Sequence, residues 1–420
     1  MKKLFFCILI ILWKFSVVAQ EVQYVALDTF PFIKYEADTL VFDKDTSLLG
    51  NFFKKMERLI ENNEGEISII QIGGSHIQAG TMSHTIRRNL LLAYPTLISN
   101  RGFVFPYSVA PKCNNPIDYR VRKNGEFSLV RNVYKDHNKP LNTSGIAVYT
   151  SDTFPEITIQ FKDSILKFQT HKLTLVGHSQ PSYVVPTIWV DSLEYFPTSI
   201  DTILGRYVYD VEFEDSFTLH PNCNGDSLQE FTLHSLILEN KKPGITFHSI
   251  GVNGASVPAY LRCENFARDL DLFRPDLVIF GIGINDAFDA DFNAETFEQN
   301  YLQLIQKIQA YNPDCAFIFF TNNDSYKRVA RRKYQVNRNA TEVQRVMYSL
   351  AKQTRGAVFD QFEIMGGMTS MYKWYTHKLA KYDRVHFTNE GYVLMGNLFY
   401  NAFLHAMKKY QNSNQSLNIE

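Results

Sequence analysis

The sequence predicts an α/β fold: a three-layer α/β/α domain with a parallel sheet, interrupted by an inserted β-sandwich domain. Three observations support this prediction. Apolar strands, glycine turns and amphipathic helices alternate before residue 100. The same order resumes at Ile245. Between Asn100 and Glu239, short alternating runs separated by turn residues replace it, which is typical of a β-sandwich.

This pattern divides the chain of 420 residues into parts. At about 100–200 residues per domain, such a length suits two or three domains. The expected division is a signal peptide (1–19), a discontinuous α/β domain (20–99 and 245–409), an inserted β-sandwich (100–244) and a flexible tail (410–420).

The first α/β segment contains a helix, a strand and a second helix in turn. Apolar residues recur at helical spacing from Asp45 to Asn62. The run Ile67–Ile72 is apolar at almost every position, as in a strand that is covered on both faces. It leads into Gly73-Gly74-Ser75-His76 and then into a helix-like stretch over 78–92. Strand, tight turn and helix are the opening of an α/β unit.

The segment after the insertion continues this alternation. Strands are expected over 245–250, 276–280, 316–320 and 357–360. Helices are expected over 261–273, 297–311, 341–353 and 391–409. The last helix would close the domain.

The N-terminus has the layout of a secretory signal peptide. Lys2 and Lys3 precede an apolar run that is too short to span a bilayer, and small or β-branched residues lead up to Ala19. We expect cleavage after Ala19 and a periplasmic or secreted protein without a later transmembrane segment. An uncleaved N-terminal anchor is the alternative.

Composition excludes several classes of function. With 43 basic and 43 acidic residues, the chain lacks the basic excess of a protein that coats nucleic acid. No phosphate loop, dinucleotide fingerprint or metal-ligand spacing occurs, so neither a cofactor nor a metal is expected. Up to two disulfides, in any of three pairings, are open to Cys113, Cys223, Cys263 and Cys315, although a buried free thiol is the simpler expectation for Cys315.

Polar residues with catalytic chemistry follow the predicted strands. Ser75 lies in a turn at the carboxyl edge of the sheet, where open α/β folds bind their ligands. Gly254 follows the next strand of the domain, where a residue without Cβ lets backbone approach a ligand closely. Asn285 follows the strand after that and carries an amide donor. Asp383 and His386 stand three residues apart, so that the carboxylate can orient the imidazole to take a proton from serine.

These residues, in this order, resemble the SGNH (GDSL-type) hydrolases. The four motifs of that family correspond to Gly73-Gly74-Ser75, Gly254, Gly283-Ile284-Asn285-Asp286 and Asp383-Arg384-Val385-His386. The resemblance implies that Ser75 is the nucleophile, activated by His386, which Asp383 orients. It also implies an oxyanion hole made of the Ser75 and Gly254 N–H groups and the Asn285 side chain. Gly74 departs from the family, which usually has Asp there, so we expect a different support for the turn.

The place of the insertion bears on the substrate. More than a hundred residues separate Ser75 from Gly254, far more than in the simplest family members. Together with His76 and the signal peptide, this resembles secreted peptidoglycan and polysaccharide O-acetylesterases, some of which carry a β-sandwich like a carbohydrate-binding module here. The implied partner is an acetylated polysaccharide or peptidoglycan. Tyr183, Trp189 and Tyr195 are either core residues or sugar-stacking residues.

Two other functions remain open. The same residues could transfer the acyl group to a sugar hydroxyl, as an O-acetyltransferase does. With Gly74 in place of the family Asp, the chain could also be a catalytically weak glycan-binding protein. The oligomeric state is left open by the sequence.

Overall fold

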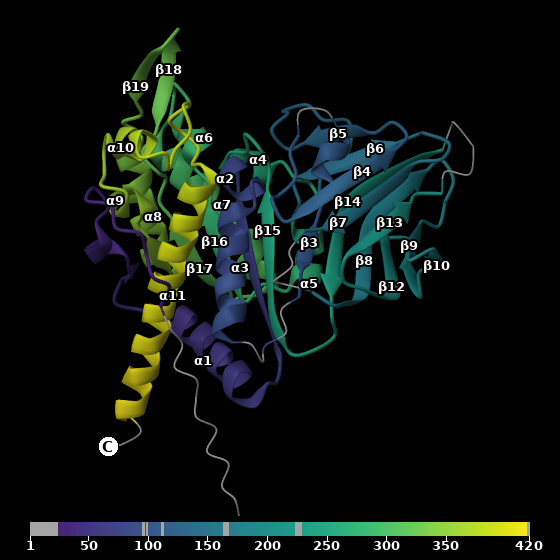
Figure 1. Ribbon diagram of the computed structural model, residues 1–420, viewed down its shortest axis with the longest axis horizontal. Coiled ribbons are helices and arrows are strands. Elements are labelled where there is room, and N and C mark those ends of the chain that lie inside the picture. The colour runs from purple at the N-terminus through teal and green to yellow at the C-terminus, as the bar shows by residue number, and fades with distance from the viewer. Residues whose placement is uncertain are drawn as a thin grey trace, which may run out of the picture.

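The computed structural model describes residues 24–94, 97, 100–110, 113–162, 168–222 and 229–417. The predicted signal peptide lies outside these residues. A six-stranded sheet forms the centre of one part of the molecule (Figure 1). Its strands, in spatial order, are β1 (Leu40–Phe42), β20 (Ala357–Phe359), β17 (Ala316–Phe320), β16 (Leu277–Gly281), β2 (Glu66–Gly73) and β15 (Gly244–Gly251). All neighbours pair in parallel except β1, which lies antiparallel to β20 at one edge.

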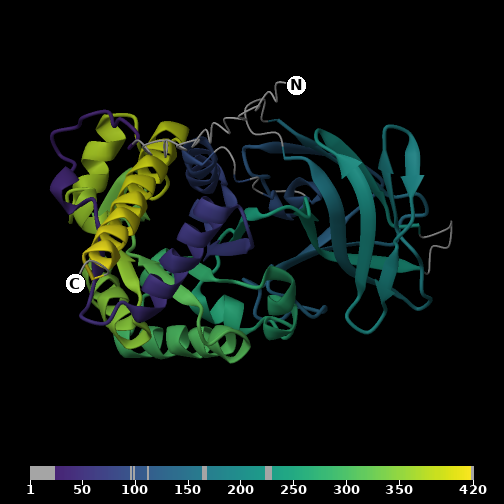
Figure 2. The same ribbon diagram turned by 90° about the horizontal axis from the view of Figure 1, so that it is seen from below.

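Helices cover both faces of this sheet, which Figure 2 shows from below. On one side lie α1 (Ser47–Asn62), α3 (Thr81–Ala93) and α11 (Asn389–Leu417); on the other lie α7 (Ala294–Tyr311) and α8 (Ala340–Thr354). In β2, Ile67 and Ile69 pack toward the first group, whereas Ile70 and Ile72 pack toward the second. This alternation between two covered faces explains why the strands are apolar at nearly every position. The predicted three-layer α/β fold is confirmed.

The insertion forms two further antiparallel sheets. One has the order β10-β9-β13-β7-β4 and the other the order β11-β12-β8-β14-β6-β5, with β3 added beside β14. Their bounds are β3 (Gly102–Val104), β4 (Tyr119–Asn124), β5 (Ser128–Arg131), β6 (Ile146–Thr150), β7 (Glu156–Phe161), β8 (Thr170–Gln180), β9 (Thr187–Val190), β10 (Leu193–Tyr195), β11 (Ser199–Asp201), β12 (Arg206–Phe213), β13 (Ser216–His220) and β14 (Glu230–Glu239). All fall inside the segment expected to be inserted; the exact domain boundaries remain a prediction.

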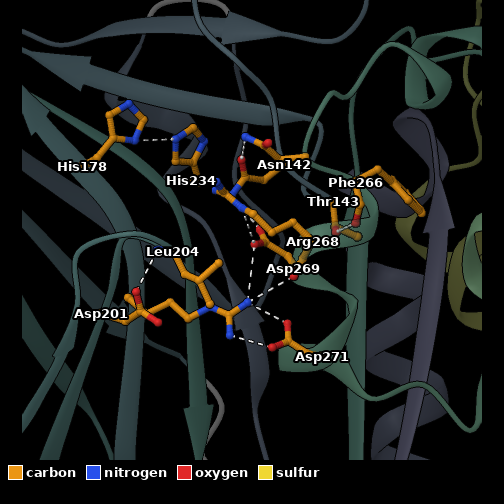
Figure 3. Close-up of polar contacts among 12 residues, drawn as sticks. Asn142, Thr143, His178, Asp201, Leu204, His234, Phe266, Arg268, Asp269 and Asp271 are labelled. Atoms are coloured by element: carbon orange, nitrogen blue, oxygen red, sulfur yellow. Dashed lines mark hydrogen bonds and ion pairs between the residues drawn. The ribbon is translucent and has the colours of Figure 1, made fainter. Parts of the chain in front are cut away.

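Apolar and polar contacts join the insertion to the α/β part. One hydrophobic cluster contains residues from both, including Ile159 and Leu219 of the insertion and Phe280 of β16. Polar contacts reinforce it (Figure 3): Asn142 Nδ2 donates to Asp269 at 2.6 Å, and Thr143 Oγ1 donates to the Phe266 carbonyl at 2.6 Å.

A second polar contact lies at the start of the insertion. Asp118 Oδ2 lies 2.8 Å from Arg101 Nη2, 3.4 Å from Arg87 Nη1 and 3.5 Å from His84 Nδ1. Burial raises the pKa of Asp118, but the two guanidinium charges and the hydrogen bond with His84 outweigh this effect. The pKa of Asp118 is therefore below its ordinary value. Because Arg87 belongs to α3, this buried ion cluster fastens the insertion to a helix of the α/β part.

Several elements differ from the sequence-based expectation. The single helix expected over 261–273 is wrong: α4 (Val257–Leu261), a 3₁₀ turn (Ala267–Asp269) and α5 (Leu270–Phe273) occupy this region. The chain leaves helical geometry because the Asn265 N–H bonds to the Leu141 carbonyl of the insertion at 3.0 Å. The helix expected over 78–92 is likewise divided, into α2 (Ser75–Gln78) and α3.

The tail also differs. The helix α11 continues to Leu417, so residues 410–417 are helical rather than a flexible extension. The ring of Tyr410 lies 5.8 Å from that of Phe53 in α1, and this packing extends the helix beyond the residue at which the sequence pattern fades. Strand β1 and the hairpin of β18 (Tyr326–Ala330) and β19 (Lys333–Val336) were not expected.

Cys113, Cys263 and Cys315 are free thiols, and Cys315 is fully buried, as expected. Cys223 lies outside the described residues. Among the helices that the structure describes, none combines the length and the apolar character needed to cross a lipid bilayer.

Candidate active site

Three neighbouring strands end at the same edge of the parallel sheet. Gly73 at the end of β2 pairs with Gly251 at the end of β15 and with Gly281 at the end of β16. The segments that follow contain Ser75, Gly254 and Asn285, which the sequence predicted as site residues. Because parallel strands point their carboxyl ends to one side, the topology brings these three segments together.

Ser75, His386 and Asp383 form a continuous chain of hydrogen bonds. Ser75 Oγ lies 2.8 Å from His386 Nε2, and His386 Nδ1 lies 2.8 Å from Asp383 Oδ2. The Asp383 carboxylate accepts a hydrogen bond from the His386 Nδ1–H, so Nε2 carries no proton and can accept the one from serine. The structure thus brings together the three residues that were predicted to be catalytic.

The loop of Asp383 is organised around its carboxylate. Asp383 Oδ1 accepts the backbone N–H groups of Val385 at 2.9 Å and of His386 at 3.0 Å. Burial raises the pKa of Asp383, but these bonds and the bond to the His386 ring more than offset it and hold the pKa at about 2. The carboxylate is therefore charged over the whole range in which an imidazole can act as a base.

Gly254 and Asn285 flank the serine turn. Gly254 has a φ of +84°, a backbone conformation that residues with side chains rarely adopt. The Asn285 Nδ2 group donates to the Ala255 carbonyl at 2.9 Å, and an amide nitrogen has a second hydrogen to offer. A Cβ added at Gly74 would lie 3.2 Å from Asn285 Nδ2, so this amide is adjacent to the residue that precedes Ser75.

The turn is supported in a way that uses no side chain at position 74. Tyr260 Oη donates to the Gly73 carbonyl at 2.8 Å. Gln78 Oε1 accepts the Asn253 N–H at 2.7 Å, which ties α2 to the residue before Gly254. Asp286 accepts a hydrogen bond from the Val257 N–H, and this bond joins the segment that follows β16 to the segment that follows β15. These contacts hold the turn without a side chain at position 74; that the support differs from the family's stays a prediction.

Two residues beside the triad were not assigned a role by sequence reasoning. The Nδ1 atom of His76 lies 3.0 Å from Tyr392 Oη, and its ring is stacked on that of His386. Burial, aided by a positive charge on His386, lowers the pKa of His76 to about 3, so this ring stays neutral near neutral pH. The position of His76 directly after Ser75 could have pointed to a place beside the triad. No sequence feature pointed to Tyr392.

The loop Thr321–Ser325 follows β17 and leads into β18. Thr321, Asn322 and Asn323 line a cavity of about 20 Å³ together with His76 and Tyr392. Asn323 Nδ2 also donates to the Val385 carbonyl at 3.0 Å. The loop therefore supports the segment that contains Asp383 and His386.

The aromatic residues of the insertion have mixed environments. Tyr195 is half-buried and packs on the hydrophobic cluster, whereas Tyr183 is 49% exposed. Trp189 is half-buried and stacks on His220 at 5.3 Å in a groove of about 270 Å³. Sugar stacking stays a prediction for Trp189 and Tyr183. In the described part of the chain, His, Cys, Asp and Glu nowhere gather in a group of three or more that could hold a metal ion.

Comparison with solved structures bears on the fold of the chain. A peptidoglycan O-acetylesterase structure superposes with a TM-score of 0.72 at 20% identity, covering 88% of this chain and 99% of that chain. An acetyl xylan esterase gives 0.30 at 19% identity, with coverages of 38% and 80%. A family two carbohydrate esterase from Cellvibrio japonicus gives 0.28 at 9% identity, with coverages of 70% and 99%. Only the first superposition is close enough to support the fold, and it includes the insertion.

No curated protein matches this chain. Residues 215–394 match the model of the GDSL-like Lipase/Acylhydrolase family, and this range contains Gly254, Asn285, Asp383 and His386. Over this range the chain therefore carries a GDSL-like lipase/acylhydrolase (SGNH) domain.

Proposed function

We propose that this protein is a secreted or periplasmic serine esterase that removes O-acetyl groups from a cell-wall or other polysaccharide. The observation that carries the proposal is the hydrogen-bonded chain from Ser75 Oγ through His386 to Asp383, with both links at 2.8 Å. Gly254 and Asn285 lie beside it, where an oxyanion hole is needed.

In the first half of the proposed reaction, Ser75 Oγ attacks the carbonyl carbon of the acetyl ester while His386 Nε2 takes the hydroxyl proton. The negative charge on the carbonyl oxygen is stabilised by the N–H groups of Ser75 and Gly254 and by the Asn285 amide. The tetrahedral intermediate then releases the sugar hydroxyl, which receives the proton from His386, and leaves an acetyl group on Ser75.

In the second half, a water molecule loses a proton to His386 and attacks the acetyl-serine carbonyl. Collapse of the second tetrahedral intermediate returns the proton to Ser75 and releases acetate. Asp383 stays ionised throughout, orients the ring and stabilises the imidazolium that forms twice in each cycle.

The carbohydrate substrate is supported by the insertion. The esterase that superposes over 88% of this chain is described as acting on peptidoglycan, and the identity of 20% means that its substrate comes to this chain only as a proposal. The insertion also reaches the site: a Cβ at Gly254 would lie 3.7 Å from Val133 Cγ1. A polymer that is bound to Ser75 would therefore touch the insertion.

The test is acetate release, measured by chromatography, from O-acetylated peptidoglycan and from acetylated xylan. We expect release by the wild-type protein and background release by Ser75→Ala. A serine-directed fluorophosphonate should label the wild-type protein and not Ser75→Ala. Acetate release by Ser75→Ala at the wild-type rate would refute the proposal, and acetyl transfer to an added unacetylated glycan in preference to water would identify a transferase instead.

A further inference from the structure

One arginine of the insertion lies beside the predicted oxyanion loop. Arg131, the last residue of β5, places Nη1 3.5 Å from the carbonyl oxygen of Asn253, the residue that precedes Gly254. In the view of Figure 1, β5 lies along the same upper side of the molecule as α2, α4 and α6, which follow the sheet strands at the site. This cation is therefore a neighbour of the place where substrate would be bound.

The guanidinium of Arg131 is held in place by its surroundings. Nη2 donates to Tyr134 Oη at 2.8 Å, and the guanidinium carbon lies 5.1 Å from the centre of the Tyr134 ring. The next residue, Asn132, is fully buried, and its carbonyl accepts from Arg262 Nη2 at 2.7 Å. Arg131 thus projects from an anchored strand end rather than from a mobile surface loop.

The charge of Arg131 has no counterpart in the described residues. No carboxylate there lies within 4.0 Å of it, and its half-buried side chain has a buried Nε–H without a hydrogen-bond acceptor. Other half-buried or buried arginines of the insertion are paired: Arg101 with Asp118 and Arg206 with Asp271. Leaving a partly desolvated cation without a counter-charge costs free energy that an anionic ligand would recover.

We propose that Arg131 is the carboxylate-binding residue of a substrate subsite beside Gly254, and that the preferred substrate is an O-acetylated glycan with a carboxylate near the ester. The inference rests on the proposed esterase function. A guanidinium binds a carboxylate through two parallel hydrogen bonds, which a neutral sugar cannot form. The carboxylate could be the lactyl group of muramic acid in peptidoglycan strands without stem peptides, or that of a uronic acid in an acidic polysaccharide.

The test compares matched substrates. The first pair is O-acetylated peptidoglycan strands, freed of stem peptides by an amidase, and the same strands with the lactyl carboxylate capped as a methyl amide. The second pair is acetylated glucuronoxylan and acetylated neutral xylan. We expect the wild-type protein to prefer a carboxylate-bearing member by roughly 10-fold or more in kcat/KM, the size of one charge-assisted contact. The pair that gives the larger preference identifies the source of the carboxylate.

The variants separate recognition from structure. Arg131→Gln should bring the preference close to one, and Arg131→Lys should retain part of it because the charge stays. The control Arg120→Gln changes an exposed arginine of β4 and should leave the preference unchanged. A preference near one in the wild-type protein, or an Arg131→Gln variant that loses the same factor on both members of a pair, would overturn the subsite.

Failure of the esterase proposal is distinguishable from failure of the subsite. If the wild-type protein releases no acetate from any glycan, the proposed function is wrong. The subsite is then decided by calorimetric titration of the Ser75→Ala protein with uncapped and capped strands. Tighter binding of the uncapped strands that disappears on adding Arg131→Gln would support it, and equal binding would refute it.

Discussion

The imidazole rings of His76 and His386 are stacked, with their centroids 5.2 Å apart and 29° between their planes. His76 resists protonation, because burial and then any positive charge on His386 lower the pKa of His76 to about 3. The proposed base therefore has a neutral aromatic neighbour, which Tyr392 holds through Nδ1. The His76 ring packs against one face of the His386 ring.

The stacking of His76 on His386 leads to a prediction about the pH dependence of the reaction. Above pH 4, protonation of His76 should make no contribution to the acid side of a plot of log kcat/KM against pH, because the pKa of His76 is held at about 3. NMR titration of the histidine ring protons, with the His76 signal assigned from His76→Gln, should show no protonation of His76 in this range. A limiting slope of two, or a His76 signal that titrates above pH 5, would contradict it.

Asn285→Ala should be crippled but still active. Loss of one of the three proposed oxyanion donors should reduce kcat by roughly 10²–10³-fold, since the two proposed backbone donors remain. Acetate release under saturating substrate measures this. Asn285→Asp is the matched variant: it keeps the size of the side chain but places a negative charge beside the oxyanion, so its activity should be lower still. An unchanged kcat in Asn285→Ala would remove Asn285 from the oxyanion hole.

Gly74→Asp, which introduces the residue usual in the family, should lower activity rather than raise it. The added Cβ would lie 3.2 Å from Asn285 Nδ2, 3.4 Å from the Ala255 carbonyl oxygen and 3.8 Å from that of Val252. A carboxylate there would crowd the Asn285 amide and face two carbonyl acceptors. Gly74→Ala introduces the same Cβ without charge and should retain more activity. Comparison of kcat/KM for the two variants tests this; a gain on Gly74→Asp would contradict it.

Asp118→Asn should destabilise the fold by about 3 kcal/mol, because it leaves two buried guanidinium groups without a counter-charge. Urea unfolding followed by fluorescence measures the change. Asp210→Asn is the control, since the ion pair of Asp210 with Lys241 is about half exposed and should contribute less than about 1 kcal/mol. Equal changes in the free energy of unfolding in the two variants would show that the buried ion cluster stabilises the fold no more than an exposed ion pair does.

Asp269 should make stability depend on pH. Burial raises its pKa to about 6, and the bond from Asn142 and the nearby arginines offset only part of this. The folded state therefore takes up a proton that the unfolded state binds only below about pH 4, so the free energy of unfolding falls as the pH rises from about 4 to about 6. This part, at most about 3 kcal/mol, should be absent in Asp269→Asn. An identical pH dependence of the melting temperature in both proteins would contradict it.

The sequence was informative where the deciding interactions are local. Strands β2, β15, β16 and β17 are apolar because helices cover both their faces, and Asp383 reaches His386 within one loop. It was uninformative where partners are far apart in the chain. The contact between Asn265 and Leu141 divides a predicted helix, the packing of Tyr410 on Phe53 prolongs another, and Arg131 meets Asn253 across the boundary of the insertion. None of these pairings leaves a periodic signal in either segment.

The hydrophobic cluster that contains both Leu219 of the insertion and Phe280 of the parallel sheet has a consequence for how the protein denatures. Because both parts bury apolar surface in one continuous core, melting either of them exposes the other to water. The two parts should unfold in one cooperative calorimetric transition. Deleting the insertion would expose apolar surface on the remaining α/β part and make it prone to aggregate. In this protein the inserted β-domain and the parallel sheet belong to one cooperative folding unit, so the insertion is not a separable module.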